Sequence, residues 1–350
     1  MTPVTAVRPV WWNWITLGSG VLLTLVATLE MRSDAQTTDR RELELVGNEI
    51  AAKVRTRLHA HAQVLRSGAA FFATASPVTR AQWRTFVEQS KVSLNLPGIQ
   101  GVGFALLIPP NGLEAHQEAI RAEGFAEYRV WPEGDRPVYS SIVYLEPFSG
   151  RNLRAFGYDM LSEPVRQAAM EQARDEDVAA LSGKVRLVQE TAEDIQAGTL
   201  MYVPVYQPGL PTGTDAQRRT ALLGWVYSPY RMTDLMQGIL GGEDRYDSQS
   251  AELAIYDGDR IAPETLLYDS RPAGAANDPA APRATTLPLD FNGHRWTLSV
   301  ARPPGYPSPS RTLPVLLVAT GGGLISLLVA GLLQALMRSR LRAVQLAEEL

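Results

Sequence analysis

The chain has 350 residues, of which 45% are hydrophobic and 20% are charged, and its formal net charge at pH 7 is −4. These values exclude a single small domain and a disordered chain, and the balanced charge argues against a nucleic-acid partner. There are no cysteines, which excludes disulfides, thiolate metal sites and a cysteine nucleophile.

Two apolar runs stand near the ends of the sequence. Residues 10–29 and residues 312–337 carry no charged side chain, and each run is long enough to cross the ~30 Å hydrocarbon core of a bilayer as one helix. A cleaved signal peptide is the alternative for the first run, but its apolar part is too long and no small-residue cleavage site follows it. We therefore expect two membrane-spanning helices.

Basic residues beside these runs predict their orientation. Arg8 precedes the first run, and Arg338 and two further arginines follow the second. Because Lys and Arg flank membrane helices on the cytoplasmic side, both termini, residues 1–9 and 338–350, are expected in the cytoplasm. The protein is then a two-pass protein of the inner (plasma) membrane, and the segment 31–311 is periplasmic or extracellular.

Residues 31–76 are expected to form a stalk helix that continues from the first span. Apolar side chains recur from Leu43 to Phe72 with a spacing near 3.6 residues, the period of an α-helix. A stripe of this kind packs against the protein's own core or against a twin helix. His59 and His61 are two positions apart and cannot chelate one metal ion from a helix, so we expect both at the surface.

The segment 77–208 mixes helical and strand patterns. Helices are expected at 79–91 and 113–123 and directly after Ser162, an N-cap residue with Pro164 behind it. Strands are expected at 98–110, 128–131, 138–145, 185–188 and 200–206.

A linker rich in Pro, Gly and charged residues, 207–219, is expected to divide the extracytoplasmic segment. The second part, 209–311, has strand and helix patterns at 221–230, 231–240, 251–260 and 265–270, and then a hairpin with Asn292-Gly293 at its turn. The predicted fold class is α+β, with a long N-terminal stalk helix and two small units between two transmembrane helices. Residues 77–208 form the membrane-distal unit and residues 209–311 the membrane-proximal unit.

Catalytic motifs are missing from the sequence. It contains no GxxxxGK[ST], HExxH or GxSxG pattern, and its four histidines are scattered. We therefore predict no catalytic residue, no metal site, no cofactor and no enzymatic activity for this segment.

Residues 144–206 hold a series of short motifs. These are Gly157-Tyr158-Asp159-Met160, Ala173-Arg174 at a helix end, Ala180-Leu181-Ser182-Gly183 and Tyr202-Val203-Pro204-Val205-Tyr206. In this order they resemble the core of the CHASE domain, the extracytoplasmic sensing module of receptor histidine kinases and nucleotide cyclases, including plant cytokinin receptors. The resemblance extends over about residues 40–305. It implies a long helix and two PAS-like units, of which the distal one holds a small-molecule pocket, in a homodimer.

The resemblance also implies site residues. In the cytokinin-binding members of the family the aspartate of the Asp-Met step bonds the adenine ring, and Asp159 matches it. Leu181 and Thr191 match two further pocket-lining positions. Two simpler roles compete, because Asp159 also suits the N-cap of a helix that begins near Glu163, and Leu181 suits an ordinary core position. The ligand class stays open, with an adenine-type molecule as one candidate.

These features predict a membrane-anchored sensor of small molecules. Ligand binding outside the cell would be relayed to a cytoplasmic output, such as a histidine kinase or a diguanylate cyclase, beyond residue 350 or in a partner protein. The expected partners are the ligand, membrane lipid and a second copy of the chain paired through the stalk helix. A doubly anchored extracytoplasmic enzyme, or a structural or adhesion module, is the alternative function.

Overall fold

The computed structural model describes residues 11–75, 77–191, 194–241, 251–271, 284–303 and 309–348. The described chain divides into two compact units, one that combines the N-terminal residues up to Glu42 with the C-terminal residues from 304, and one that comprises residues 43–303. The first helix, α1 (Trp11–Thr74), contributes to both units. It confirms the expected stalk helix and joins it to the first apolar run without a break.

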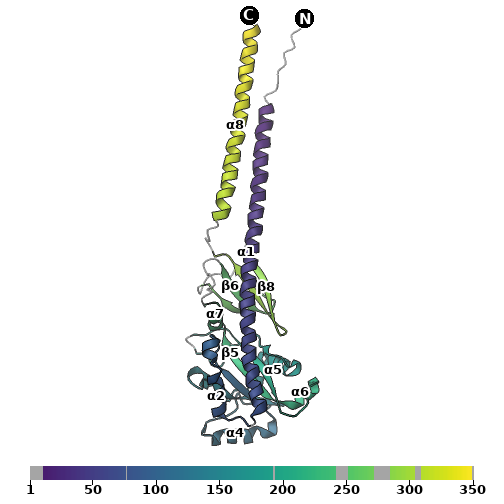
Figure 1. Ribbon diagram of the computed structural model, residues 1–350, viewed down its shortest axis with the longest axis vertical. Helices are drawn as coiled ribbons and strands as arrows, with labels where there is room; N and C mark the ends of the chain where they lie inside the picture. The colour runs from purple at the N-terminus through teal and green to yellow at the C-terminus, as the bar shows by residue number, and fades with distance from the viewer. Residues whose placement is uncertain are drawn as a thin grey trace. The chain divides into compact units, whose positions relative to one another are not determined.

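The first unit consists of two helices, the N-terminal part of α1 and α8 (Pro309–Glu348). Each contains a stretch long and apolar enough to cross a membrane. Small residues bring the two helices together, because a Cβ atom added at Gly20 would lie 2.5 Å from Ser326 Oγ, and one added at Gly322 would lie 2.5 Å from Thr24 Oγ1. Such close approach at small residues is typical of helix pairs in membranes, and the pair is visible in Figure 1.

The second unit contains a five-stranded antiparallel sheet. Its strand order is β2-β1-β5-β4-β3. The strands are β1 (Val102–Ile108), β2 (Tyr139–Glu146), β3 (Ala180–Leu181), β4 (Gly198–Tyr206) and β5 (Leu222–Arg231). The helices around it are α2 (Arg80–Gln89), α3 (Val92–Asn95), α4 (Leu113–Ala122), α5 (Pro164–Glu176) and α6 (Asp215–Ala221), with short 3₁₀ turns at Pro110–Gly112, Gly150–Ala155 and Met160–Ser162.

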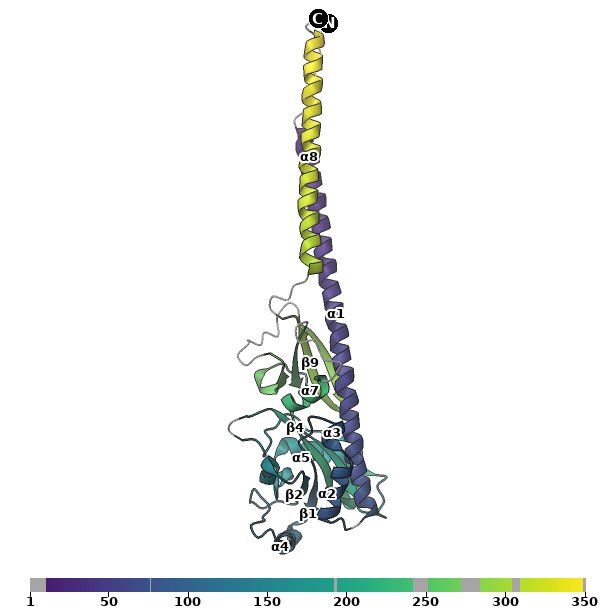
Figure 2. The ribbon, with the colours of Figure 1, turned by 60° about the vertical axis from the view of Figure 1, so that its left-hand side comes forward.

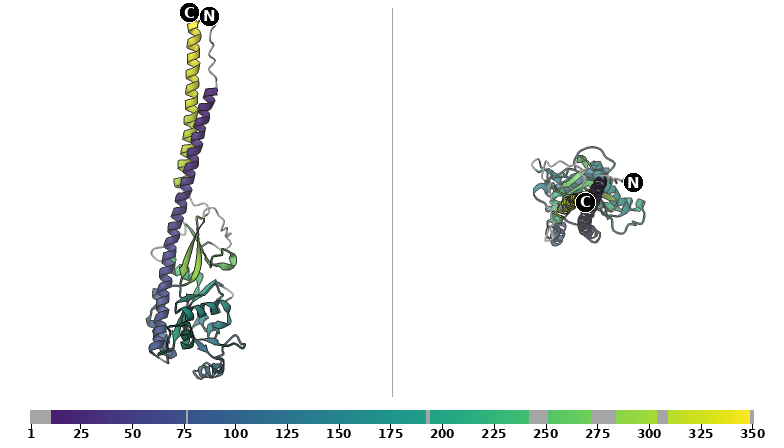
Figure 3. Two further views of the ribbon diagram at one scale, coloured as in Figure 1. Left: turned by 90° about the vertical axis from the view of Figure 1, so that its right-hand side faces the viewer. Right: turned by 90° about the horizontal axis from the view of Figure 1, so that it is seen from above.

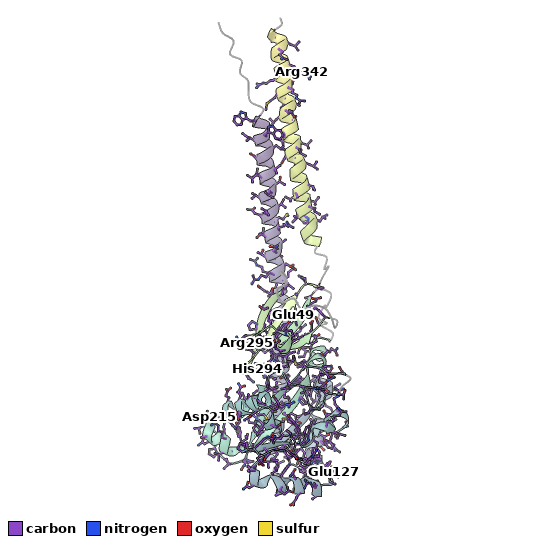
Figure 4. The ribbon with its side chains drawn as sticks, turned by 180° about the vertical axis from the view of Figure 1, so that it is seen from behind. Glu49, Glu127, Asp215, His294, Arg295 and Arg342 are labelled. Carbon is purple, nitrogen blue, oxygen red and sulfur yellow. The ribbon has the colours of Figure 1, made fainter. Side chains whose placement is uncertain are left out.

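A four-stranded antiparallel sheet follows, with the order β7-β6-β9-β8. Its strands are β6 (Glu252–Asp257), β7 (Leu266–Asp269), β8 (Thr285–Phe291) and β9 (His294–Ala301), and helix α7 (Met232–Leu240) leads into it. Asn292 and Gly293 form the expected hairpin turn, and both have the positive φ angles, 46° and 85°, that a type I′ turn requires. Figure 4 shows His294 and Arg295 on this sheet.

The part of α1 from Leu43 onward runs along one face of both sheets (Figures 1 and 2). Gly47 and Gly68 permit this close packing, because a Cβ atom at Gly47 would overlap Leu287 of the smaller sheet and one at Gly68 would lie 3.2 Å from Val226 of β5. The apolar stripe is buried in this contact: Leu43 is 1% exposed and Phe72 is 5% exposed.

This packing confirms the own-core alternative for the stripe and corrects the expected exposure of His61. The stripe from Leu43 to Phe72 covers the chain's own sheets, so it is not available to a twin helix; an antiparallel sheet needs one face covered, and α1 covers it. His61 is fully buried and stacks on Tyr230 of β5, with ring centroids 5.3 Å apart. Only His59 of the two histidines is exposed.

Strand pairing and helix capping also correct three details of the sequence prediction. Strand β5, expected in the second unit, pairs with β1 and β4 of the five-stranded sheet, because residues 207–219 connect two neighbouring strands of one sheet. Residues 128–131 and 185–188 contribute only the isolated bridges of Trp131 and Val185. The N-cap of α5 is Glu163, whose carboxylate accepts the N–H groups of residues 165 and 166, and not Ser162.

Candidate functional site

The face of the five-stranded sheet that points away from α1 packs against α5 and carries the residues of interest (Figure 3, left). Alternation along the strands separates the two faces. On β4, Tyr202 points to the α5 side, whereas its neighbours Met201 and Val203 point to the core shared with α1. The register places Tyr202 opposite Tyr227 of β5, and Tyr227 opposite Gly103 of β1.

Asp159 lies beside this face and is fully buried. Its Oδ1 atom accepts three hydrogen bonds, from the backbone N–H of Ser140 at 2.8 Å, the Ser140 hydroxyl at 3.1 Å and the N–H of Leu161 at 3.1 Å. The last of these caps the 3₁₀ turn Met160–Ser162. The capping alternative is therefore realised for this short turn, while Glu163 caps α5.

The second carboxylate oxygen of Asp159 differs from the first. Oδ2 is buried and has no hydrogen-bond partner, and it forms an ion pair with Arg136 Nη1 at 3.3 Å. Burial raises the pKa of Asp159, while the hydrogen bonds from Ser140 and Leu161 and the charge of Arg136 oppose that rise. One oxygen is thus held in place and the other retains acceptor capacity for a donor.

Residues that precede Asp159 in the sequence line an open groove of about 560 Å³, which is rich in aromatic side chains. Its lining residues are Phe125, Ala126, Glu127, Tyr128, Arg129, Trp131, Leu153 and Phe156. Trp131 connects the groove to Asp159, because its carbonyl oxygen accepts the Asp159 N–H at 2.6 Å and its ring contacts Tyr158 edge-on at a centroid distance of 4.8 Å. Figure 4 shows Glu127 of this groove close to α4.

The structure does not bring the three predicted site residues together. Leu181 is 2% exposed and packs in the core shared with α1, whereas the preceding residue, Ala180, faces the α5 side. A one-residue step along a strand reverses the side of the sheet, so Leu181 occupies the core position that the simpler alternative assigned to it. Thr191 is half-buried in an irregular segment that follows Glu190.

Next to Thr191 lies an ionic cluster that sequence reasoning missed, built around the buried pair of Arg231 and Glu190. Arg231, at the end of β5 and 4% exposed, donates to Glu190 Oε1 at 2.7 Å, to Asp194 Oδ2 at 2.6 Å and to Asp234 Oδ2 at 2.8 Å. These three carboxylates thereby balance the positive charge of its guanidinium. The members come from two segments about 40 residues apart in sequence, Glu190 with Asp194 and Arg231 with Asp234, which the pairing of β4 with β5 brings together.

Sequence reasoning also missed three polar residues on the α5 side. Arg166 of α5 is 3% exposed, and the hydroxyl groups of Tyr202 and Tyr227 are buried without hydrogen-bond partners. Arg166 is the third residue after the N-cap of α5, and the two tyrosines lie in apolar strand patterns, where they resemble ordinary core residues. Within the described ranges no cluster of three or more histidine and acidic side chains is suited to hold a metal ion.

Comparison with known proteins finds one family match and solved structures of low similarity. The CHASE domain family matches residues 76–268. Two of the solved structures that match do so at low sequence identity. The ligand-binding domain of the Pseudomonas aeruginosa amino acid chemoreceptor PctB, in complex with L-Arg, is 12% identical, with 76% of this chain and 95% of that chain covered and a TM-score of 0.42. The periplasmic sensory domain of the Campylobacter jejuni chemoreceptor Tlp1 is 9% identical, with 81% and 95% covered and a TM-score of 0.38.

A comparison with curated proteins found no significant relative. The family match covers more than half of the chain and includes Asp159, α5 and the whole five-stranded sheet. By this match the chain belongs to the CHASE domain family.

Proposed function

We propose that this protein is a membrane-anchored sensor whose segment between the two apolar helices binds a small molecule outside the cell and relays binding to a cytoplasmic output. The observation that carries the proposal is the CHASE match over residues 76–268, which lies between two helices long and apolar enough to span a membrane. The output would be a histidine kinase or a nucleotide cyclase, as in other CHASE receptors.

Asp159 is proposed to orient the ligand. Its Oδ1 is fixed by Ser140 and Leu161, and its buried Oδ2 has no hydrogen-bond partner. A ligand N–H group, such as one on an adenine-type ring, would satisfy this oxygen, and a few well-placed polar groups give such pockets their specificity. The neighbouring groove at Trp131 supplies apolar aromatic surface for the rest of the ligand.

Contacts between the two sheets provide a path for the relay. The tip of the β8–β9 hairpin touches α5 and the residue before β3, because Gln172 donates to the carbonyl oxygen of Asn292 at 2.9 Å and Asn292 donates to that of Ala179 at 2.8 Å. Asp257 of β6 accepts the N–H of Lys184 at 2.7 Å. A ligand that moves α5 would shift the smaller sheet through these bonds, provided that it binds the two arrangements with different affinity.

The binding proposal is tested with the full chain in lipid nanodiscs. A metabolite library is screened by thermal unfolding followed through tryptophan fluorescence. A ligand at 100 times its Kd adds about 2.7 kcal/mol, which corresponds to a rise in Tm of roughly 5 to 10 °C. The Asp159→Asn variant should lose most of this rise, and the matched variant Asp259→Asn, which changes a side chain that is 78% exposed, should keep it. A library with no stabilising member would contradict the proposal.

Membrane topology has its own test, which the absence of native cysteines makes clean. In intact cells a membrane-impermeant maleimide should label Ala216→Cys, on the surface of α6, and should leave Ser339→Cys unlabelled. Labelling of both sites, or of Ser339→Cys alone, would refute the proposed orientation. A homodimer paired through the stalk helix would use the exposed face of α1, so Ala52→Cys and Gln63→Cys, on that face, should crosslink between two chains.

A further inference from the structure

The side chain of Arg166 is buried on the α5 side of the sheet without a compensating carboxylate. It is 3% exposed, and it donates to the Tyr158 hydroxyl at 2.7 Å and to the carbonyl oxygen of Arg186 at 2.9 Å. Among the described residues none offers it an ion pair within 4 Å, in contrast to Arg231, which meets three carboxylates. The nearby Glu163 uses its carboxylate to cap the backbone N–H groups of α5.

Two further donors accompany this guanidinium. The hydroxyl groups of Tyr202 and Tyr227 are fully buried and have no hydrogen-bond partner, and the two rings lie 6.2 Å apart in register on adjacent strands. Burial raises the pKa of both hydroxyls, and the positive charge of Arg166 acts against that rise at each of them. The ring of Tyr158, whose hydroxyl accepts from Arg166, packs in the same core as the rings of Tyr202 and Tyr227.

Such an arrangement is costly in a protein that binds nothing there. A buried charge without a counter-charge and a buried hydroxyl without a partner each reduce stability. Proteins retain such groups where a ligand supplies the missing partner, and a guanidinium with neighbouring hydroxyl groups offers the charge and the hydrogen-bond donors that a carboxylate needs.

We infer that Arg166, Tyr202 and Tyr227 form a binding subsite for an anionic group of the ligand, most simply a carboxylate. This inference rests on the proposed sensor function and specifies its ligand class. Tyr158, which accepts from Arg166 and precedes Asp159 in the chain, connects the subsite to the carboxylate that was proposed to accept a ligand N–H. The ligand would then carry an anionic group and, at another position, a hydrogen-bond donor.

The test uses formate, the smallest carboxylate, as its probe and the full chain in lipid nanodiscs as the protein. Formate has three heavy atoms, and the upper limit of binding energy per atom corresponds to millimolar affinity. At constant ionic strength, formate in place of chloride should raise Tm saturably, whereas formamide should not. No rise with formate would overturn the inference.

Variants then assign the effect to the subsite. Arg166→Met and Tyr202→Phe should weaken formate binding by about tenfold or more, the size expected when one charge-assisted hydrogen bond is lost. The matched variant Arg186→Met removes an exposed arginine nearby and should leave formate binding unchanged. Equal binding to wild type and to Arg166→Met would show an adventitious ion only and overturn the inference. If Arg166→Met does not fold, Tyr202→Phe, which deletes one hydroxyl, decides the outcome by the same criterion.

The screen described for the proposed function separates the two hypotheses. A neutral ligand that depends on Asp159 and binds Arg166→Met as well as wild type would keep the sensor function and overturn the anion subsite. Ligands that are all anionic and that lose affinity in Arg166→Met but not in Arg186→Met would support both.

Discussion

His61 makes the folded protein sensitive to acid. The imidazole lies between α1 and β5, is fully buried, and has no hydrogen-bond partner at either nitrogen. Burial, with a smaller contribution from the charge of Arg57, lowers the pKa of His61 from 6.5 to about 3. The unfolded chain therefore takes up a proton near pH 6.5, and the folded protein does not until the pH is far lower.

The sign of the effect follows from this difference. Above pH 6.5 the imidazole is neutral in both states and adds no pH dependence. As the pH falls below 6.5, only the unfolded state gains a proton, so the free energy of unfolding decreases by about 1.4 kcal/mol per pH unit until the folded pKa of His61 is reached. At pH 5 the loss is about 2 kcal/mol.

The substitution His61→Phe removes the titrating group and keeps an aromatic ring against Tyr230. Between pH 7.5 and pH 5, the free energy of unfolding of wild type should fall by about 2 kcal/mol more than that of the variant. Both are measured by urea unfolding of the full chain in nanodiscs, followed by tryptophan fluorescence. His59→Phe, which removes an exposed imidazole from the same helix, is the matched control. Parallel pH profiles of His61→Phe and wild type would refute the assigned burial.

Three further predictions concern packing and hydrogen bonds, each measured by the same unfolding assay at pH 7.5. Arg231→Met leaves the buried carboxylate of Glu190 without its nearest cation and should cost about 3–5 kcal/mol; a loss below 1 kcal/mol would show that the Glu190 carboxylate is solvated. Gly103→Ala places a Cβ atom 2.6 Å from the Tyr227 ring and should cost about 1–3 kcal/mol, an expectation that unchanged stability would contradict. Asn292→Ala loses the bond to the Ala179 carbonyl and a side chain that tolerates positive φ, so about 1–2 kcal/mol should be lost, and a neutral effect would rule out this hairpin contact.

Local features of the fold could be predicted from the sequence because they depend on neighbouring residues. The helical period of α1, the capping box of Thr79 at the start of α2, and the Asn292-Gly293 turn all arise from residues within a few positions of one another. The apolar stripe of α1 was likewise evident, although its partner was not. Periodicity identifies a face that must be covered, but it does not identify what covers it.

Membership of a sheet and the surroundings of buried polar groups were decided only by the tertiary structure. Residues 207–219 have the composition of a linker between domains, yet β5 returns to the same sheet because its apolar residues complete both cores between β1 and β4. Asp159 could be proposed as a site residue from its motif. Arg166, Tyr202 and Tyr227 could not, because their missing partners become apparent only when strand register and helix packing bring them together and exclude water.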